Sequence, residues 1–212
     1  MGGSGNRFGS STPKQFISLG GKPLFTHALE TLRQSNLFDE ILLVVHPDWP
    51  ITAPEKIIHG GSTRQESSYL GLLGFTQKPD IVLIHDAVRP FISTDILRNN
   101  IETALLHGAA DTCIPSADTL VYAPNGLITE IPNRSHFARG QTPQTFNYDL
   151  VLQAHKQALA DQISNASDDC QLLVRLDYPV PIVTGNERNI KITTEFDLQL
   201  AEHLITCKAA LH

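Results

Sequence analysis

The chain has 212 residues, 41% of them hydrophobic and 18% charged, a balance typical of a soluble globular protein with one domain and a sizeable core. Its net charge of −6 argues against a broad nucleic-acid or anionic-membrane surface, so any anion must be bound by a local cluster of basic residues. No segment has the pattern of a signal peptide or a membrane span. Cys113, Cys170 and Cys207 form no close pair that would indicate a disulfide framework or a zinc site, so we expect a cytoplasmic protein with reduced thiols.

Residues 1–15 form a glycine-rich segment with two basic side chains. Glycines such as Gly3 and Gly5 allow the backbone to come close to a ligand, so that amide groups can point at oxyanions. Arg7 and Lys14 add two positive charges. The segment matches neither the Walker A string nor the dinucleotide fingerprint. A flexible tail is the simpler alternative, but Arg7 and the apolar segment after Lys14 favour a polyphosphate-binding loop.

Helix-like and strand-like segments alternate through the first half of the chain. Helical patterns occur at 23–34, at 64–73 and between Ser93-Thr94 and Gly108, and apolar runs typical of buried strands occur at 41–45 and 81–84. This alternation predicts an α/β fold with a Rossmann-like, doubly wound, mostly parallel sheet.

The pattern changes in the second half. Residues 119–122 and 127–131 are rich in β-formers and flank Asn125-Gly126, which is a hairpin signal. A hairpin cannot bury both of its faces alone, so within a single domain of residues 1–212 we expect 117–140 to be a β-arm that reaches a second subunit. The remaining predicted elements are helices at 148–160 and 167–175, strands at 180–183 and 189–192, and a last helix capped by Thr193-Thr194.

One strand that this fold requires is missing from the chain. In such a sheet a glycine-rich loop follows the carboxyl end of a first, central strand, yet here the chain begins at the loop. Two explanations stay open: upstream residues are omitted, or the protein lacks that strand.

Polar residues that follow a buried strand are candidates for ligand binding, because ligands bind at the carboxyl ends of strands in open α/β sheets. His85, Asp86 and Arg89 follow the predicted strand at 81–84. Asp86 can bind sugar or polyol hydroxyls or approach a metal phosphate, and Arg89 can hold a phosphate or orient Asp86. The alternative is an Asp–Arg pair that only caps the next helix, and His85 is more typical of a packed side chain than of an acid or base.

A second turn of small residues, 60–63, precedes the helix predicted to begin at Arg64. It can present backbone amides and Ser67 to a base or sugar, or it can simply start the helix with Ser62 or Thr63 as the N-cap. Three other polar residues, Arg134, Thr142 and Lys191, are isolated, and each by itself is typical of solvated surface. Lys191 lies between two isoleucines of a predicted strand, so its side chain should share a face with neither.

The available chemistry indicates direct phosphoryl transfer. Two basic residues in a glycine loop, with no Ser–His or Cys–His arrangement, favour attack by a substrate phosphate on a nucleoside triphosphate. An attacking phosphate is already anionic, so alignment and charge neutralisation matter more than a base. We expect Mg²⁺ to be held mainly by the triphosphate, with no dedicated metal site on the protein.

Six motifs in order along the chain carry a family resemblance. They are Gly3-Ser4-Gly5-Asn6-Arg7, Pro13-Lys14-Gln15, Gly60-Gly61-x-x-Arg64-x-x-Ser67, His85-Asp86-Ala87-Val88-Arg89-Pro90, Gln141-Thr142-Pro143-Gln144 and Asn189-Ile190-Lys191-Ile192-Thr193. Together they resemble the cytidylyltransferases that make CDP-methylerythritol or CDP-ribitol. The match covers nearly the whole chain and is far more specific than any single motif.

The resemblance implies a homodimer with a β-arm that transfers CMP from CTP to 2-C-methyl-D-erythritol 4-phosphate or D-ribitol 5-phosphate and releases pyrophosphate. It implies catalytic roles for Arg7, Lys14 and Lys191. The implied CTP-binding residues are Gly3, Ser4, Gly5, Gly61, Arg64, Ser67, Asp86 and Ala87. The implied polyol-phosphate residues are Asp86, Arg89, Thr119, Arg134, Thr142 and Lys191, with Thr119 and Arg134 offered by the partner's arm.

The acceptor is less well determined than the family. The segments 131–134 and 139–144, together with Asp169-Cys170, look more like the ribitol-phosphate branch, whereas the shared motifs serve both branches. The alternatives are a non-catalytic nucleotide-binding dimer, a nucleotidyltransferase for another sugar phosphate, and a Rossmann oxidoreductase.

Overall fold

The computed structural model describes residues 13–49 and 51–209, so the predicted loop residues Gly3, Ser4, Gly5 and Arg7 lie outside the described part. The elements in its first half are a 3₁₀ turn at Lys14–Phe16, β1 (Ser18–Leu19), β2 (Lys22–Pro23), α1 (Leu24–Ser35), β3 (Leu42–Val45), β4 (Lys56–His59), α2 (Arg64–Leu73), β5 (Ile81–Ile84) and α3 (Thr94–His107). Its second half contains β6 (Ala109–Pro115), a 3₁₀ turn at Arg134–His136, β7 (Ala138–Asn147), α4 (Tyr148–Ala160), α5 (Cys170–Val174), β8 (Ile182–Thr184) and α6 (Glu195–Ala209).

The main sheet has four strands in the order β5-β7-β6-β8. β6 and β8 are parallel neighbours, and β7 runs antiparallel to both β5 and β6, so three of the four strands point the same way. β3 and β4 form a separate parallel pair. The predicted α/β fold with a mostly parallel sheet is confirmed. In residues 13–49 and 51–209 no strand joins the pair β3-β4 to the main sheet.

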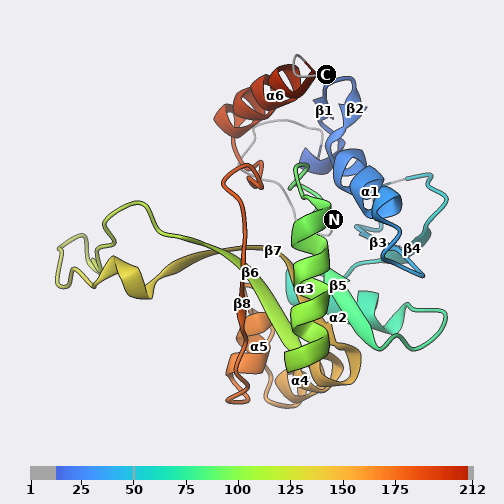
Figure 1. Ribbon diagram of the computed structural model, residues 1–212. Coiled ribbons are helices and arrows are strands. Elements are labelled where there is room, and N and C mark those ends of the chain that lie inside the picture. Colours follow the sequence, from blue (N-terminus) through green and yellow to red (C-terminus); the bar gives the residue numbers. More distant parts are fainter. Residues whose placement is uncertain (1–12, 50, 210–212) are drawn as a thin grey trace.

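Helices cover both faces of the main sheet (Figure 1). On one face, Ala104 of α3 packs against Ala110 of β6 and the β8 residue Val183. On the other face, Val151 of α4 lies in a larger cluster with Phe146 of β7 and with residues of α2 and α5. Because the central strands are covered on both sides, residues of both faces are buried in them, Ala109 and Ala110 in β6 and 141–146 in β7.

Local sequence signals set several helix ends as predicted. Thr63 caps α2 by accepting a hydrogen bond from the Glu66 amide at 3.0 Å. Ser93 caps α3 by accepting one from the Ile96 amide, and Gly108 ends α3 in the left-handed conformation with φ of 78°. Each cap satisfies a backbone group that the helix leaves unpaired.

Five strands were not predicted: β4, β6 and β7, and the two-residue strands β1 and β2. β6 contains Ala109, Ala110 and Asp111 in place of β-branched residues, so it lacks a strand-like composition. β7 contains Gly140 and Pro143, which argue against an interior strand, although β7 lies between β5 and β6. In both strands tertiary packing outweighs local preference.

The predicted hairpin is reduced to a single antiparallel bridge between Tyr122 and Glu130. Residues 116–137 nevertheless form a segment that projects from the body between β6 and β7 (Figure 1). Tyr122, Leu127, Ile128 and Ile131 are exposed there. A two-stranded ribbon without a third strand or a covering helix is only marginally stable, which explains the short pairing.

Three other predicted elements differ from the structure. The helix predicted at 167–175 is limited to α5. Before it, the Ser167 amide donates to Gln171 Oε1 and Asp168 Oδ1 accepts from the Gln171 amide, so these residues cap the helix instead of extending it. The strand predicted at 180–183 is shifted to β8. The strand predicted at 189–192 is an irregular segment. No helix in the described part is long and apolar enough to cross a bilayer.

Candidate active site

Asp86 lies directly after β5, at the carboxyl edge of the sheet, with cations around it. Its Oδ2 atom is 2.8 Å from Lys191 Nζ and 3.8 Å from Arg89 Nε. Burial favours the neutral acid, but the charges of Lys191, Arg64 and Arg89 outweigh burial and lower the pKa of Asp86 to about 2. Asp86 is therefore a carboxylate at neutral pH, and Lys191 is held beside it.

A chain of hydrogen bonds fixes the loop that carries Asp86. The Asp86 amide donates to Thr142 Oγ1 at 3.0 Å, and this hydroxyl is also 3.0 Å from His85 Nδ1. His85 Nε2 is 3.1 Å from the Arg89 carbonyl, which can only accept, so Nε2 carries the hydrogen and Nδ1 accepts from Thr142. Burial lowers the pKa of His85, which keeps the ring neutral. The packed role expected for His85 fits these contacts.

Arg89 is a buried support for this edge of the sheet. Its guanidinium donates to the carbonyl of Asn189 at 2.8 Å and reaches the carbonyl of Gly140 at 3.5 Å. Burial lowers the pKa of Arg89, but an arginine stays charged throughout the neutral range. Its Nε atom has no hydrogen-bond partner among the described residues and lies beside the Asp86 carboxylate. Arg89 thus connects the Asp86 loop to β7 and to the segment after β8.

The irregular segment 189–193 carries one predicted catalytic lysine, Lys191, and contacts another, Lys14. Asn189 donates to the Thr142 carbonyl at 2.8 Å, and the buried Ile192 donates its amide to the Val88 carbonyl at 2.9 Å. Lys191 lies between these anchors with its side chain at Asp86, and Ile192 points into the core, whereas Ile190 lines the same cavity as Lys191. Nearby, Lys14 Nζ donates to the Thr193 carbonyl at 3.2 Å.

Arg64, at the start of α2, belongs to a largely buried ion-pair network. Its Nη1 atom donates to Asp169 Oδ2 at 2.8 Å, and His155 Nε2 donates to the other carboxylate oxygen at 2.9 Å. Burial favours the neutral acid, but the His155 hydrogen bond and the Arg64 charge outweigh it and lower the pKa of Asp169. The charge of Arg64 also acts on Asp86. Asp169 therefore holds a cation in place near the Asp86 cluster.

The turn before α2 depends on two glycines. A Cβ atom at Gly60 would meet Ser67 Oγ at 2.8 Å, and one at Gly61 would overlap the Glu66 side chain. Ser67 Oγ donates to the Thr63 carbonyl at 2.8 Å, so its hydroxyl is engaged within the helix. The turn is thereby packed tightly against the first turn of α2.

A cavity of about 270 Å³ lies beside the Asp86 cluster. Its lining residues are Arg89, Ile114, Arg139, Gly140, Gln141, Glu187, Ile190, Lys191 and Asp197. Three cations and two carboxylates, Glu187 and Asp197, line it, and Arg139 is paired with Glu187 at 2.7 Å. A small phosphorylated molecule bound there would meet Arg89 and Lys191.

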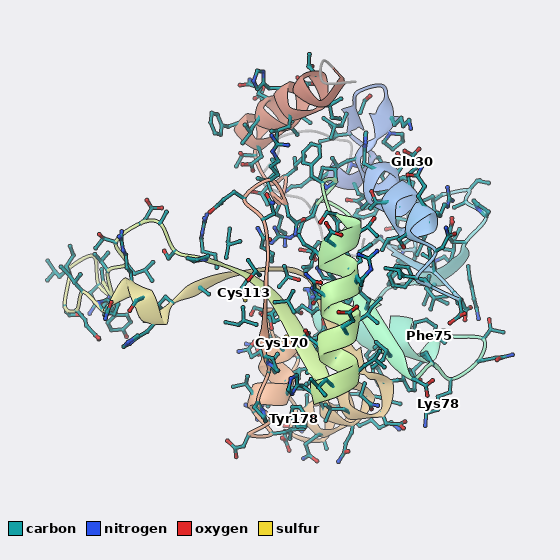
Figure 2. All side chains as sticks on the ribbon, viewed as in Figure 1. Glu30, Phe75, Lys78, Cys113, Cys170 and Tyr178 are labelled. Carbon is teal, nitrogen blue, oxygen red and sulfur yellow. The ribbon has the colours of Figure 1, made fainter. Side chains whose placement is uncertain are left out.

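The described cysteines take no part in this site. Cys113 of β6 and Cys170 of α5 are buried, and Figure 2 shows both within the body of the molecule. Burial raises the pKa of the Cys113 thiol to about 12 and that of Cys170 as well. Neither thiol is ionised at neutral pH, so neither can act as a nucleophile.

The structure brings together only some of the predicted site residues. Lys14, Asp86, Arg89, Thr142 and Lys191 are linked through the contacts given above, and Ala87 packs against the cluster containing Leu43 and Val45. Thr119 and Arg134 lie apart from them on the projecting segment, where Arg134 donates to the Ala117 carbonyl at 2.9 Å.

Sequence reasoning gave no site role to Arg139, His155, Asp169 or Asp197. A signal existed only for Asp197, because Thr194 and Asp197 have the spacing of a helix capping box.

Comparison with known proteins identifies the family. The model of the 2-C-methyl-D-erythritol 4-phosphate cytidylyltransferase family matches residues 1–207. The chain belongs to this family. The family and the enzyme class inferred from the sequence, a CTP-dependent nucleotidyltransferase, are confirmed.

Relatives carry both acceptor names. A ribitol-5-phosphate cytidylyltransferase of Lactiplantibacillus plantarum is 36% identical over 96% of this chain and 95% of its own length. A 2-C-methyl-D-erythritol 4-phosphate cytidylyltransferase of Syntrophus aciditrophicus is 41% identical over 95% of this chain and 91% of its own length. Among solved structures, the 2-C-methyl-D-erythritol 4-phosphate cytidylyltransferase of Thermus thermophilus matches with a TM-score of 0.83 and 34% identity, covering 92% of this chain and 94% of that one.

Proposed function

We propose that this chain transfers CMP from CTP to a small polyol phosphate, D-ribitol 5-phosphate or 2-C-methyl-D-erythritol 4-phosphate, and releases pyrophosphate. The observation that carries the proposal is the group formed by Asp86, Lys191 and Arg89 at the carboxyl edge of the sheet, beside a cavity that Arg89 and Lys191 line. Membership of a cytidylyltransferase family indicates that the nucleotide substrate is CTP.

In the proposed reaction a phosphate oxygen of the polyol attacks the α-phosphorus of CTP, and the bond to the pyrophosphate oxygen breaks. The attacking oxygen is already anionic, so no general base is needed, and the described thiols are not ionised. Lys14 and Lys191 would lower the barrier by neutralising charge on the reacting phosphates, with Arg7 from the glycine-rich loop in the same role. Lys14 is held at its tip by the Thr193 carbonyl, to which Nζ donates at 3.2 Å.

The two substrates would occupy different sides of Asp86. CTP would be bound by Gly3, Ser4, Gly5, Gly61, Arg64, Ser67, Asp86 and Ala87. The polyol phosphate would lie in the cavity beside Arg89 and Lys191, where the ionised Asp86 can accept hydrogen bonds from polyol hydroxyls. Thr142 would act mainly by fixing the Asp86 loop through its hydroxyl.

Mg²⁺ would be held mainly by the triphosphate. This ion favours phosphate oxygens with one or two carboxylates, and the described residues contain no cluster of three or more His, Cys, Asp or Glu side chains suited to a metal. Asp86, the carboxylate of the group, is already held by Lys191. When bound, the ion would neutralise charge on the departing pyrophosphate.

The segment 117–140 would act as a dimerisation arm in the cytoplasmic enzyme. Exposed apolar residues on this segment, including Leu127 and Ile131, support a contact with a second copy. Its projection from the body supports the delivery of Thr119 and Arg134 to the partner's site. The two cysteines described by the structure are buried free thiols, which fits the reduced cytosol.

A pyrophosphate-release assay tests the proposed function. The protein is incubated with CTP and Mg²⁺ and with each acceptor separately, D-ribitol 5-phosphate first. Release with one acceptor and formation of the matching CDP-polyol are expected. A folded protein that binds CTP but releases no pyrophosphate with either acceptor would contradict the proposal and favour a non-catalytic nucleotide-binding dimer. Release of pyrophosphate only with another sugar phosphate would change the identity of the acceptor and leave the proposed reaction type in place.

A further inference from the structure

One carboxylate oxygen at the start of α6 accepts an unusual number of hydrogen bonds. Asp197 Oδ2 lies 2.8 Å from the Thr193 amide, 2.9 Å from the Thr193 hydroxyl and 2.8 Å from the Thr194 amide. In return, the Asp197 amide donates to Thr194 Oγ1 at 3.2 Å. The reciprocal pair is a capping box, but the bonds to Thr193 extend beyond the helix into the preceding segment.

Those extra bonds fix the residue that holds Lys14. The Thr193 carbonyl accepts from Lys14 Nζ, while the amide and hydroxyl of the same residue are held by Asp197. Lys191, two residues earlier, contacts Asp86. Asp197 also lines the cavity beside this group. A single side chain on α6 therefore anchors a segment that contacts two lysines of the proposed reaction.

We infer that Asp197 is a positioning residue that places the Lys14 ammonium by fixing the Thr193 carbonyl. This inference rests on the proposed function of Lys14. A lysine is a point charge on a flexible stem, so its location depends on the groups that hold its tip. Freeing the 193–194 backbone lets the Thr193 carbonyl turn away, so the ammonium loses this anchor and is placed less accurately at the reacting phosphate.

Two substitutions in the same cap separate positioning from helix stability. Asp197→Ala removes every bond to Oδ2, whereas Thr194→Ala removes only the acceptor for the Asp197 amide and leaves Thr193 held. Both variants should lower Tm. Asp197→Ala should also lower kcat by roughly 10- to 100-fold, whereas Thr194→Ala should keep a kcat close to that of the unsubstituted protein.

A third variant tests whether acceptor geometry or charge matters. Asp197→Asn keeps an oxygen that can accept from the same donors, so it should restore most of the kcat lost in Asp197→Ala. If Asp197→Ala does not fold, the comparison of kcat between Asp197→Asn and Thr194→Ala still tests the positioning role of Asp197. A kcat for Asp197→Asn at least as high as that of Thr194→Ala supports the geometric role, and a much lower kcat contradicts it.

A double-mutant cycle with Lys14 shows whether Asp197 acts through that residue. In a Lys14→Ala background, Asp197→Ala should have little further effect on kcat. An undiminished effect in that background, or equal kcat values for Asp197→Ala and Thr194→Ala, would overturn the inference. Either result leaves the proposed function intact as long as the unsubstituted protein releases pyrophosphate. Absence of pyrophosphate release from that protein would instead remove the proposed function.

Discussion

At the scale of single residues, Asp86 is the charge on which the site depends. It faces Lys191 at 2.8 Å and Arg89 at 3.8 Å, and its side chain is only 19% exposed. Without its negative charge, two cations would remain close together with little water between them. The carboxylate therefore contributes to stability as well as to binding.

This contribution should depend on pH in a defined direction. The folded pKa of about 2 lies below the ordinary value of 3.8, so the stabilisation is complete above pH 4 and is lost as the pH falls through 2. A shift of this size corresponds to about 2 kcal/mol at neutral pH. Urea unfolding should therefore show Asp86→Asn less stable than the unsubstituted protein at pH 7, with the difference shrinking between pH 4 and pH 2. A difference that stays constant over this range would contradict the assignment.

Asp169 should matter more for stability than any exposed carboxylate. Its side chain is 1% exposed and holds both Arg64 and His155. Removing one member of such a network leaves buried charge without a partner, so Asp169→Ala should lower the free energy of unfolding by roughly 3 kcal/mol.

An exposed ion pair supplies the control for Asp169. Asp149 pairs with Lys78 at 2.6 Å, and both side chains are more than 60% exposed. Figure 2 shows Lys78 at the periphery of the molecule. Asp149→Ala should cost about 1 kcal/mol or less. Equal losses for the two substitutions in urea unfolding would show that the Asp169 network is not stabilising.

At the scale of secondary structure, Gly108 controls the junction between α3 and β6. Its φ of 78° is unfavourable for any residue with a Cβ atom, and a Cβ there would overlap the Tyr178 hydroxyl. That hydroxyl donates to the His107 carbonyl at the end of α3. Gly108→Ala should therefore cost more than the roughly 1–2 kcal/mol of backbone strain alone.

Gly126 is the control that separates the cost of backbone strain from the cost of steric overlap. It has a similar φ of 76°, but a Cβ atom would meet nothing within 4 Å. Thermal unfolding should show a clearly larger fall in Tm for Gly108→Ala than for Gly126→Ala. A similar fall in Tm for the two variants would mean that the Tyr178 side chain moves aside without loss of stability.

Elements with a strong local signal were predicted well. The helices α2 and α4 and the strand β5 have the predicted bounds, because caps and apolar runs are encoded by neighbouring residues. β6 and β7 were missed, because Ala110 and Gly140 favour a strand only inside this sheet. Segment 189–193 looked like a strand because its isoleucines flank Lys191, yet contacts from Arg89 and Gln141 hold it in an irregular form.

At the scale of the whole molecule, the proposed dimer should allow two inactive variants to complement each other. Lys14→Ala and Arg134→Ala would each be nearly inactive alone. If Arg134 serves the partner's site, a mixed dimer has one site with both residues intact. An equal mixture, after exchange of subunits, should regain about a quarter of the unsubstituted activity. Light scattering should show a dimer, and a monomer at assay concentration would contradict the shared site.

The sequence alone determined the family, the α/β class and the polar groups that follow β5. The motifs and the helix and strand patterns each consist of residues that are close together in the sequence. Neighbouring residues determine local geometry wherever the segment lies in the fold. Tertiary structure alone decided which distant groups meet. Lys14 reaches Thr193 across 179 positions, and Arg64 reaches Asp169 across 105. The antiparallel pairing of β7 with β5 likewise brings Thr142 to Asp86. No local pattern encodes these contacts, because they depend on how the whole chain packs.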